Sequence, residues 1–433
     1  MPKVLMKGNE AIGEAAIQAG CIHFFGYPIT PQSEVPEYLA KRLPEVGGKY
    51  VQAESEVAAS NMIYGSAGVG IRVLTTSSSP GVSLMSEGIS YIAGAELPVV
   101  LVNIMRGGPG LGGILPAQGD YMQATKGPGH GDFKLLVLAP ASVQEAVNLV
   151  ILAFELAEKY RNPVMVIGDG MIGQMMEPVE FPVEGVGPPL DPGNWALTGC
   201  KDREPRVVNS LFLDAGELHD HNVKLKEKYD RMAREEPRWE LYNCDKPFDL
   251  MVAAYGTVSR ICKTAIDELE EEGIHVGLFR PITVFPYPYQ ACRETMDKAK
   301  RVLTVEMSMG QMIEDVRLAG EGTKQVDFYG KAGGVVPSPD QVKEQILRSL
   351  ESIPGRRRGK KKAVKKAAKT KKKAPKKNAK KTAKKTAKPK KKTTAKRSAK
   401  KTTKKTTKKS AKKKATKKSA TKARSKKTAG RKR

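Results

Sequence analysis

The chain of 433 residues is poor in the side chains that build metal sites and disulfide frameworks, with only five cysteines and five histidines. The cysteines are scattered along the sequence as Cys21, Cys200, Cys244, Cys262 and Cys292. No two of them have CxxC spacing, so we expect neither an iron–sulfur cluster nor a zinc site nor a disulfide framework on this chain. The histidines form no ligand pattern either, since His219 and His221 lie in a charged segment where we expect them to be solvated. We therefore expect no metal site.

Long hydrophobic runs are also missing. The first twenty residues contain no unbroken apolar run of signal-peptide length, and no later stretch approaches the ~20 apolar residues of a membrane span. Together with the scattered cysteines, this predicts a reducing, cytoplasmic setting and no membrane partner.

Acidic residues are missing from the last part of the chain. Residues 356–433 contain 42 of the 75 Lys and Arg and neither Asp nor Glu, so residues 1–355 hold 33 basic residues against 46 acidic ones. The formal net charge of +29 is therefore a property of the tail, and the rest of the chain is acidic.

The tail repeats units such as KKTA, KKTT and KKSA, interrupted by Pro375 and Pro389, and has no aromatic residue. Such a segment buries too little apolar surface to offset its ordering entropy, so we predict that residues 354–433 are disordered in isolation. The tail resembles the C-terminal tails of linker histones and of bacterial histone-like proteins. Lysines without aromatics favour sequence-independent contact with phosphates of DNA or another polyanion. Two alternatives are contact with the chain's own acidic surface and contact with an acidic ferredoxin.

Residues 1–185 alternate short apolar runs with longer segments of helical spacing. The runs cover residues 22–29, 49–54, 72–78, 99–105, 135–140 and 164–169. Continuous apolar strands separated by helices predict a parallel sheet covered on both faces. The clearest helix is 142–160, for which Ser142 is a suitable N-cap with Glu145 three residues later.

Residues 186–246 carry Pro and Gly early and then a charged helix near 216–235, which predicts a linker that wraps over the surface. A second α/β pattern covers residues 247–353, with strands at 250–256, 275–282, 301–307 and 325–330. The sequence thus predicts an α/β protein with two parallel-sheet domains and a disordered basic tail.

The first chemically informative motif is YPITPQSE at 27–34, which follows a strand. Pro28 and Pro31 fix the backbone around Thr30, so its hydroxyl is held at the carboxyl end of a parallel strand, where ligands bind in open α/β sheets. The alternative is an ordinary loop in which Pro31 starts the next helix.

Two further motifs follow strands in the same way. In QAESEVAASNMIYG (52–65), Glu56 lies at a helix start among apolar neighbours. It either complements the helix dipole or, as a carboxyl in apolar surroundings, shares a proton with a ring nitrogen. In NIMRGGPGLGG (103–113), Arg106 is the only basic residue between Arg72 and Lys126, which suits bidentate capture of a small carboxylate.

Together these motifs resemble the α-type, pyrimidine-binding subunit of thiamine-diphosphate-dependent 2-oxoacid:ferredoxin oxidoreductases. The resemblance rests on YPITP, the SE-x-A-A helix start and the strand ending MRGG, with Glu56 and Arg106 50 residues apart. The run at 106–132 looks most like the branched-chain (3-methyl-2-oxobutanoate) members. Residues 278–288 and 302–317 are similar to their transketolase C-terminal-like domain, so the resemblance covers roughly residues 1–350.

The resemblance implies a role for each motif. Glu56 would hydrogen-bond the aminopyrimidine ring of the cofactor and support its deprotonation chemistry, with Tyr27 and Pro28 beside it. Thr30 and Arg106 would hold the oxo and carboxylate oxygens of the 2-oxoacid.

The same resemblance implies an enzyme that is active only as a complex. A β-type partner would supply the diphosphate half of thiamine diphosphate with its Mg²⁺, and γ and ferredoxin-like subunits would carry iron–sulfur clusters. The acyl group would pass to coenzyme A and the electrons to ferredoxin. A 2-oxoglutarate-specific subunit is one alternative, and a nucleic-acid-binding protein with an enzyme-like scaffold is another.

Two motifs are interpreted as decoys. GPGLGG at 108–113 matches a dinucleotide fingerprint, but Pro116 soon follows and no clear βαβ unit is evident. GDG at 168–170, followed by Asn194, has the spacing of an Mg²⁺-diphosphate motif, but the intervening Pro- and Gly-rich stretch has no helix to carry it. Asp169 is therefore interpreted as part of a sheet-edge turn, and His130 receives no role.

Overall fold

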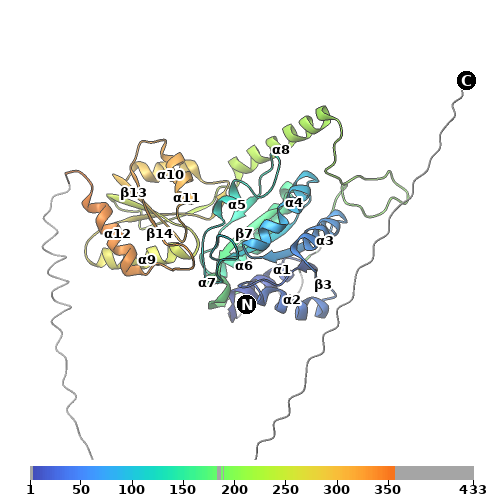
Figure 1. Ribbon diagram of the computed structural model, residues 1–433, viewed down its shortest axis with the longest axis horizontal. Helices are drawn as coiled ribbons and strands as arrows, with labels where there is room; N and C mark the ends of the chain where they lie inside the picture. The colour runs from blue at the N-terminus through green and yellow to red at the C-terminus, as the bar shows by residue number, and fades with distance from the viewer. Residues whose placement is uncertain (1–2, 183–186, 189, 356–433) are drawn as a thin grey trace, which may run out of the picture. The chain divides into compact units, whose positions relative to one another are not determined.

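The apolar runs of the first half form a seven-stranded sheet in the computed structural model, which describes residues 3–182, 187–188 and 190–355 (Figure 1). The strand order is β12-β6-β7-β5-β4-β2-β3, and all pairs are parallel except β12 with β6. The strands are β2 (His23–Gly26), β3 (Lys49–Gln52), β4 (Val73–Ser77), β5 (Val100–Met105), β6 (Leu136–Leu138), β7 (Val164–Asp169) and β12 (Thr283–Phe285). The four strands β4 to β7 are buried along their whole length, as continuous apolar runs predict.

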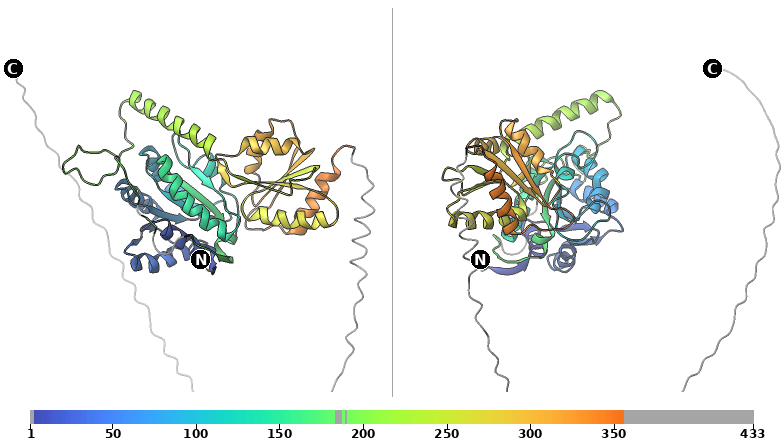
Figure 2. Two further views of the ribbon diagram at one scale, coloured as in Figure 1. Left: turned by 180° about the vertical axis from the view of Figure 1, so that it is seen from behind. Right: turned by 60° about the vertical axis from the view of Figure 1, so that its left-hand side comes forward.

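Helices cover both faces of this sheet. On one face α1 packs against α6 and α2, and on the other α3 packs against α4, so that α4 is in front in Figure 1 and α6 in the view from behind (Figure 2). The helices are α1 (Gly8–Gln18), α2 (Glu34–Glu45), α3 (Glu56–Gly68), α4 (Pro80–Gly94), α5 (Tyr121–Thr125), α6 (Val143–Tyr160) and α7 (Gly170–Gln174). Ser142 caps α6 by accepting from the amide of Glu145, which confirms the predicted cap. An antiparallel pair, β1 (Val4–Lys7) with β8 (Met176–Val179), was not part of the prediction.

The stretch predicted as a linker contains two regular elements. Helix α8 (Ala215–Glu235) corresponds to the expected charged helix, and it buries Leu225, Tyr229 and Met232. Strand β9 (Trp239–Tyr242) was not expected, and it pairs antiparallel with β11 at the edge of the second sheet. Residues 186–246 therefore contribute a strand to the second domain as well as a connection.

The second sheet has the order β14-β13-β10-β11-β9 and is parallel apart from β9. Its other strands are β10 (Leu250–Ala253), β11 (Gly277–Pro281), β13 (Arg301–Glu306) and β14 (Val326–Gly330). Its helices are α9 (Gly256–Glu271), α10 (Tyr289–Asp297), α11 (Met312–Gly320) and α12 (Pro339–Glu351). Helices α9 and α12 pack together, as do α10 and α11, and the two pairs lie on opposite faces of the sheet (Figure 1). The two parallel-sheet α/β domains are thus confirmed.

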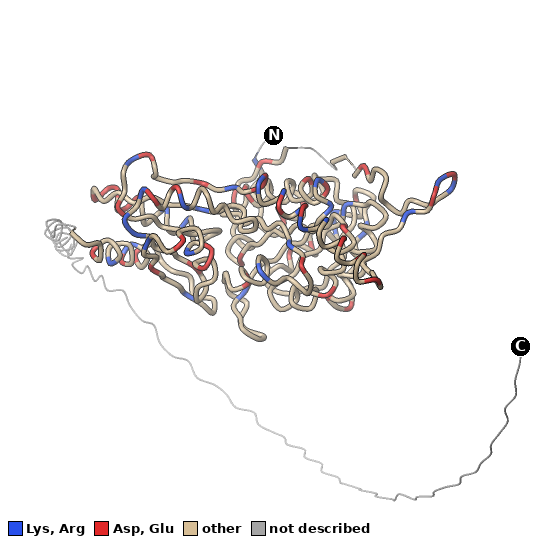
Figure 3. Tube along the Cα trace, turned by 90° about the horizontal axis from the view of Figure 1, so that it is seen from above, with Lys and Arg blue, Asp and Glu red and all other residues tan. Residues whose placement is uncertain are grey.

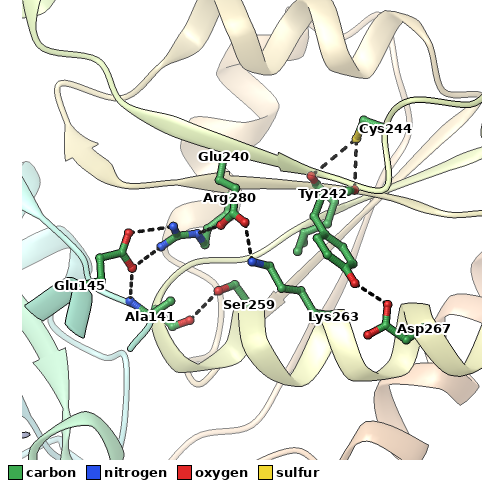
Figure 4. A network of polar contacts seen from close by, with 11 residues as sticks. Ala141, Glu145, Glu240, Tyr242, Cys244, Ser259, Lys263, Asp267 and Arg280 are labelled. Carbon is green, nitrogen blue, oxygen red and sulfur yellow. Dashed lines mark hydrogen bonds and ion pairs between the residues drawn. The ribbon is translucent and has the colours of Figure 1, made fainter. Parts of the chain in front are cut away.

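An ion-pair network around the buried Arg280 joins the two domains (Figure 4). Arg280 on β11 is only 5% exposed and donates two 2.8 Å hydrogen bonds to Glu145 of α6. It also donates a 2.6 Å bond to Glu240 of β9, which in turn pairs with Lys263 of α9 at 2.5 Å. Because β12 also extends the first sheet, the second domain is fixed against the first by both backbone pairing and buried charge.

Charged residues are interspersed over both domains of the described part (Figure 3). No helix there is long and apolar enough to cross a membrane. Nor do the described residues bring three or more His, Cys, Asp or Glu together in a group that could hold a metal ion. The predicted disordered tail, residues 356–433, lies outside the described residues.

Candidate functional site

The three predicted motifs meet at one edge of the first sheet. They follow β2, β3 and β5, which lie in the order β5-β4-β2-β3, and their loops start at the carboxyl ends of these strands. That edge is where open α/β sheets bind ligands. The segment from the end of β4 to the start of α4, residues 77–81, lies between the motifs, although the sequence did not single it out.

Thr30 lies in an exposed loop whose backbone carbonyls accept hydrogen bonds from buried side chains. The carbonyl of Thr30 accepts a 2.9 Å hydrogen bond from Nη1 of Arg106. Gln32, which is fully buried, donates to the carbonyl of Tyr27 at 3.2 Å, and Asn9 donates to the carbonyl of Pro31 at 2.8 Å. The loop therefore presents Thr30 from a fixed backbone.

Tyr27 and Pro28, the expected cofactor contacts, are both exposed in the same loop, Tyr27 to 37%. Pro31 does not start the following helix, because α2 begins at Glu34. The loop after β2 is therefore longer than an ordinary strand-to-helix turn would require.

Glu56 is the first residue of α3, as predicted, and is only 4% exposed. Ser55 caps the helix by accepting from the amide of Ala58. The carboxylate lies directly against the start of α4, because a Cβ on Gly81 would stand 2.5 Å from Oε1 of Glu56 and 2.2 Å from Oγ of Ser77. The buried carboxyl of Glu56 and the hydroxyl of Ser77 therefore both lie against the backbone of Gly81.

Three buried polar atoms at this edge have no hydrogen-bond partner among the described residues. They are Oγ of Ser77, Oγ of Ser78 and Nε of Arg106. Buried polar groups without a partner are costly, so unpaired atoms in one place indicate a ligand or partner that supplies the bonds. Oγ of Ser77 lies beside the carboxylate of Glu56, and a polar heterocycle with donor and acceptor nitrogens would suit these two groups.

Arg106 is 8% exposed, and two nitrogens of its guanidinium group already donate hydrogen bonds within the chain. Nη1 donates to the carbonyl of Thr30 at 2.9 Å, and Nη2 donates to that of Leu111 at 3.2 Å. The structure thus brings Arg106 and Thr30 together, as the motif order suggested. The guanidinium orders the two loops as well as facing the site.

A cavity of about 730 Å³ opens beside Thr30. It is lined by Thr30, Pro31, Ser33, Glu34, Ile114, Leu115, Pro116, Gly170, Met171, Gln174 and Met175. Among these described residues Glu34 is the only ionisable one. Burial opposes ionisation of Glu34, but hydrogen bonds from Gln174 and Asn9 outweigh it and lower the pKa of the carboxyl. The cavity is therefore mostly apolar, and its one carboxylate pairs with Lys7 at 3.6 Å.

Neither decoy motif has the local structure that its pattern requires. Asp169 is 2% exposed and caps α7 by accepting from the amides of Met171 and Ile172, and burial raises its pKa. The segment of Asn194 packs near Gly70, at the opposite edge of the sheet, so the two cannot share one metal ion. The glycines of 108–113 lie in a loop, and no helix begins before α5. His130 contacts the ring of Tyr91 edge-on.

The sequence missed a polar cluster under the site. Ser79, Asn103 and Asp120 are joined by hydrogen bonds, and burial raises the pKa of Asp120 despite the bonds it accepts. These residues come from three separate segments with no motif in common, so only the fold brings them together. No sequence signal identified them.

Comparison with known proteins shows what the chain is similar to. Residues 14–235 match the family described as pyruvate flavodoxin/ferredoxin oxidoreductase, thiamine diP-bdg, and residues 249–342 match pyruvate:ferredoxin oxidoreductase core domain II. The ketoisovalerate oxidoreductase subunit VorB of Methanothermobacter thermautotrophicus is 49% identical over 346 residues, covering 80% of this chain and 97% of that protein. The 2-oxoglutarate synthase subunit KorA of the same organism is 34% identical, covering 79% and 98%.

A solved structure is similar as well. The 2-oxoglutarate:ferredoxin oxidoreductase of Magnetococcus marinus, with 2-oxoglutarate, coenzyme A and succinyl-CoA bound, matches with a TM-score of 0.69 and 26% identity. The match covers 81% of this chain but only 65% of that one, so the present chain spans about two thirds of the solved chain.

Proposed function

Because the chain belongs to the 2-oxoacid:ferredoxin oxidoreductase family and is a subunit of such an enzyme, we propose that it carries the pyrimidine half of the active site in a branched-chain member. The reaction proposed is the coenzyme A-dependent oxidative decarboxylation of 3-methyl-2-oxobutanoate to an acyl-CoA and CO₂, with reduction of ferredoxin. The observation that carries the proposal is the position of buried Glu56 beside the unpartnered hydroxyl of Ser77.

Each site residue has one task in this proposal. Glu56, with Tyr27 and Pro28 nearby, binds the aminopyrimidine ring of thiamine diphosphate and holds a proton at a ring nitrogen. When bound, the cofactor supplies a nucleophilic carbon and an electron sink for decarboxylation. Thr30 and Arg106 bind the oxo and carboxylate oxygens of the substrate and orient it, with Nε of Arg106 as the donor that its own chain leaves unused.

The cavity beside Thr30 supports a branched, uncharged side chain in the substrate. Its walls include Ile114, Leu115 and Met171, which suit an isopropyl group. The lining residues include no Lys or Arg to bind the second carboxylate of 2-oxoglutarate. The higher identity to the ketoisovalerate enzyme than to the 2-oxoglutarate enzyme points the same way.

This subunit needs partners to act. A β-type subunit supplies the diphosphate-binding half with Mg²⁺, and γ and ferredoxin-like subunits supply the iron–sulfur clusters that pass electrons to ferredoxin. Co-purification of the tagged full chain tests this part. Recovery of DNA without any thiamine-diphosphate subunit would favour instead a nucleic-acid-binding protein with an enzyme-like scaffold.

The catalytic assignment is tested with Glu56→Gln in the reconstituted complex. We expect no measurable 3-methyl-2-oxobutanoate-dependent reduction of a viologen dye, while the thermal unfolding midpoint stays near that of the wild type. Glu54→Gln is the matched control, since Glu54 is exposed two residues earlier in the chain. A full-rate Glu56→Gln complex would refute the assignment. A kcat/KM of the wild-type complex that is higher for 2-oxoglutarate than for 3-methyl-2-oxobutanoate would refute the proposed substrate.

We propose further that the basic tail binds polyanions without sequence preference. Its 42 cations would match about 70 Å of duplex DNA at one charge per ~1.7 Å. A chain truncated after Gly355 should keep the turnover of the complex and lose salt-sensitive retention on DNA. Retention of DNA by the truncated chain would contradict this.

A further inference from the structure

The loop after β4 has an unusual backbone at Ser79. This residue has φ 25° and ψ −81°, and residues with a Cβ seldom adopt such a positive φ. Such conformations persist where the surroundings impose them, and they gather at functional sites. The contacts that impose this one come from β5 and from the segment just before α5.

Asp120 lies at the centre of these contacts. Its Oδ2 accepts from Oγ of Ser79 at 2.6 Å and from Nδ2 of Asn103 at 3.0 Å. Oδ1 of Asn103 accepts from the amide of Ser79 at 3.0 Å, so the amide and the hydroxyl of Ser79 are both engaged. Asn103 is fully buried, which removes competition from water.

The hydrogen-bonded cluster of Ser79, Asn103 and Asp120 is connected to both Arg106 and Glu56. Oγ of Ser79 also accepts a 3.0 Å hydrogen bond from the amide of Arg106, so the loop is tied to the residue that carries the guanidinium. Two residues after Ser79, the backbone of Gly81 forms the surface against which the carboxylate of Glu56 lies. The carboxylate of Asp120 thus fixes the position of the Ser79 loop, which lies between Glu56 and Arg106.

We propose that Asp120 is a positioning residue that, acting through Ser79, fixes Glu56 and Arg106 relative to each other. This rests on the proposed function, because it gives Asp120 a role in binding thiamine diphosphate and the 2-oxoacid without contact to either. A carboxylate that only stabilised the fold would change the amount of folded protein and leave the properties of each folded complex unaltered.

The test compares Asp120→Ala with Asp120→Asn in the reconstituted complex. Asp120→Ala should lower kcat about 100-fold, the order expected when a catalytic group moves by about 1 Å. It should also weaken the binding of thiamine diphosphate with Mg²⁺, measured by calorimetry, about tenfold, as for the loss of one hydrogen bond of ~1.4 kcal/mol. Asp120→Asn should restore most of both, because the amide oxygen can accept the same two bonds.

Gln123→Ala is the control, since it removes a 2.8 Å bond from α5 to Ser83 of α4 and leaves the bonds of Asp120 to Ser79 and Asn103 in place. Wild-type kcat, KM and cofactor affinity in Asp120→Ala would overturn the proposal. So would a loss that disappears when rates are divided by the folded fraction, or an Asp120→Asn variant as impaired as Asp120→Ala. If Asp120→Ala does not fold, Ser79→Ala, which keeps the carboxylate, gives the same comparison.

Failure of the proposed function is a separate outcome. If the wild-type complex turns over no 2-oxoacid, the proposed function is wrong. Hydrogen exchange of residues 73–90 in the full chain then decides the inference by itself. Faster exchange in Asp120→Ala than in Gln123→Ala supports the role of Asp120 in fixing the loop, and equal exchange refutes it.

Discussion

Replacing Gly81 with alanine would create a steric clash with the carboxylate of Glu56, the candidate catalytic residue. The added Cβ would stand 2.5 Å from Oε1 of Glu56 and 2.2 Å from Oγ of Ser77, whereas ordinary contacts begin at 3.4 Å. Glu56 must therefore retreat by about 1 Å, and Ser77 by slightly more, or α4 must shift. A displacement of about 1 Å is enough to lower kcat about 100-fold.

The stability of Gly81→Ala should change much less than its activity. Alanine in a helix gains about 1 kcal/mol over glycine, which offsets part of the ~1–3 kcal/mol that overpacking costs. Dye reduction by the reconstituted complex gives kcat, and chemical unfolding of the full chain gives stability.

Gly65→Ala is the matched control for this prediction. It lies in the neighbouring helix α3, where an added Cβ meets nothing within 4 Å, so activity should be unchanged. A Gly81→Ala complex with wild-type kcat would show that the position of Glu56 against α4 does not matter for turnover, and the reasoning would fail.

Three further predictions concern the substrate loop, the domain joint and a buried lysine. Thr30→Val should lower kcat/KM for the 2-oxoacid about 100-fold by removing a donor, and Thr30→Ser should restore it; equal activity of the two variants would argue against a role for the hydroxyl. Glu145→Gln should cost about 3 kcal/mol of unfolding free energy, because Arg280 stays buried with only Glu240 as partner; urea unfolding that shows less than 1 kcal/mol would contradict this. Burial lowers the pKa of Lys228 from its ordinary 10.5 to about 8, so the folded protein loses this proton before the unfolded chain does. The penalty for the buried charge is complete below pH 8 and disappears as the pH rises towards 10.5, which should add about 2 kcal/mol of stability between pH 8 and 10. Lys228→Met should lack this rise, and identical pH profiles for the two proteins would refute it.

Most strands of both sheets could be predicted from the sequence because they are short, continuous apolar runs, whereas the half-exposed β9 was not expected. Helix starts with a local signal were predictable too, as with Ser142 capping α6. The loops of Thr30, Glu56 and Arg106 could be assigned to one edge, since parallel strands place their carboxyl ends together. The basic tail is defined by composition alone.

Interactions between distant segments had no such local signal. Strand β12, only three residues long, joins the first sheet although it follows a strand of the second. Glu145 was expected to complete the cap of α6, but its carboxylate accepts from the amide of Ala141 and binds Arg280 of the other domain.

The sequence by itself marked Thr30, Glu56 and Arg106 as candidate site residues, because each follows a strand and their motifs together resemble a known family. Only the tertiary structure decided what holds them. Ser79, Asn103 and Asp120 meet because three segments cross beneath the same loop, and hydrogen bonds between them depend on distances that no sequence spacing encodes.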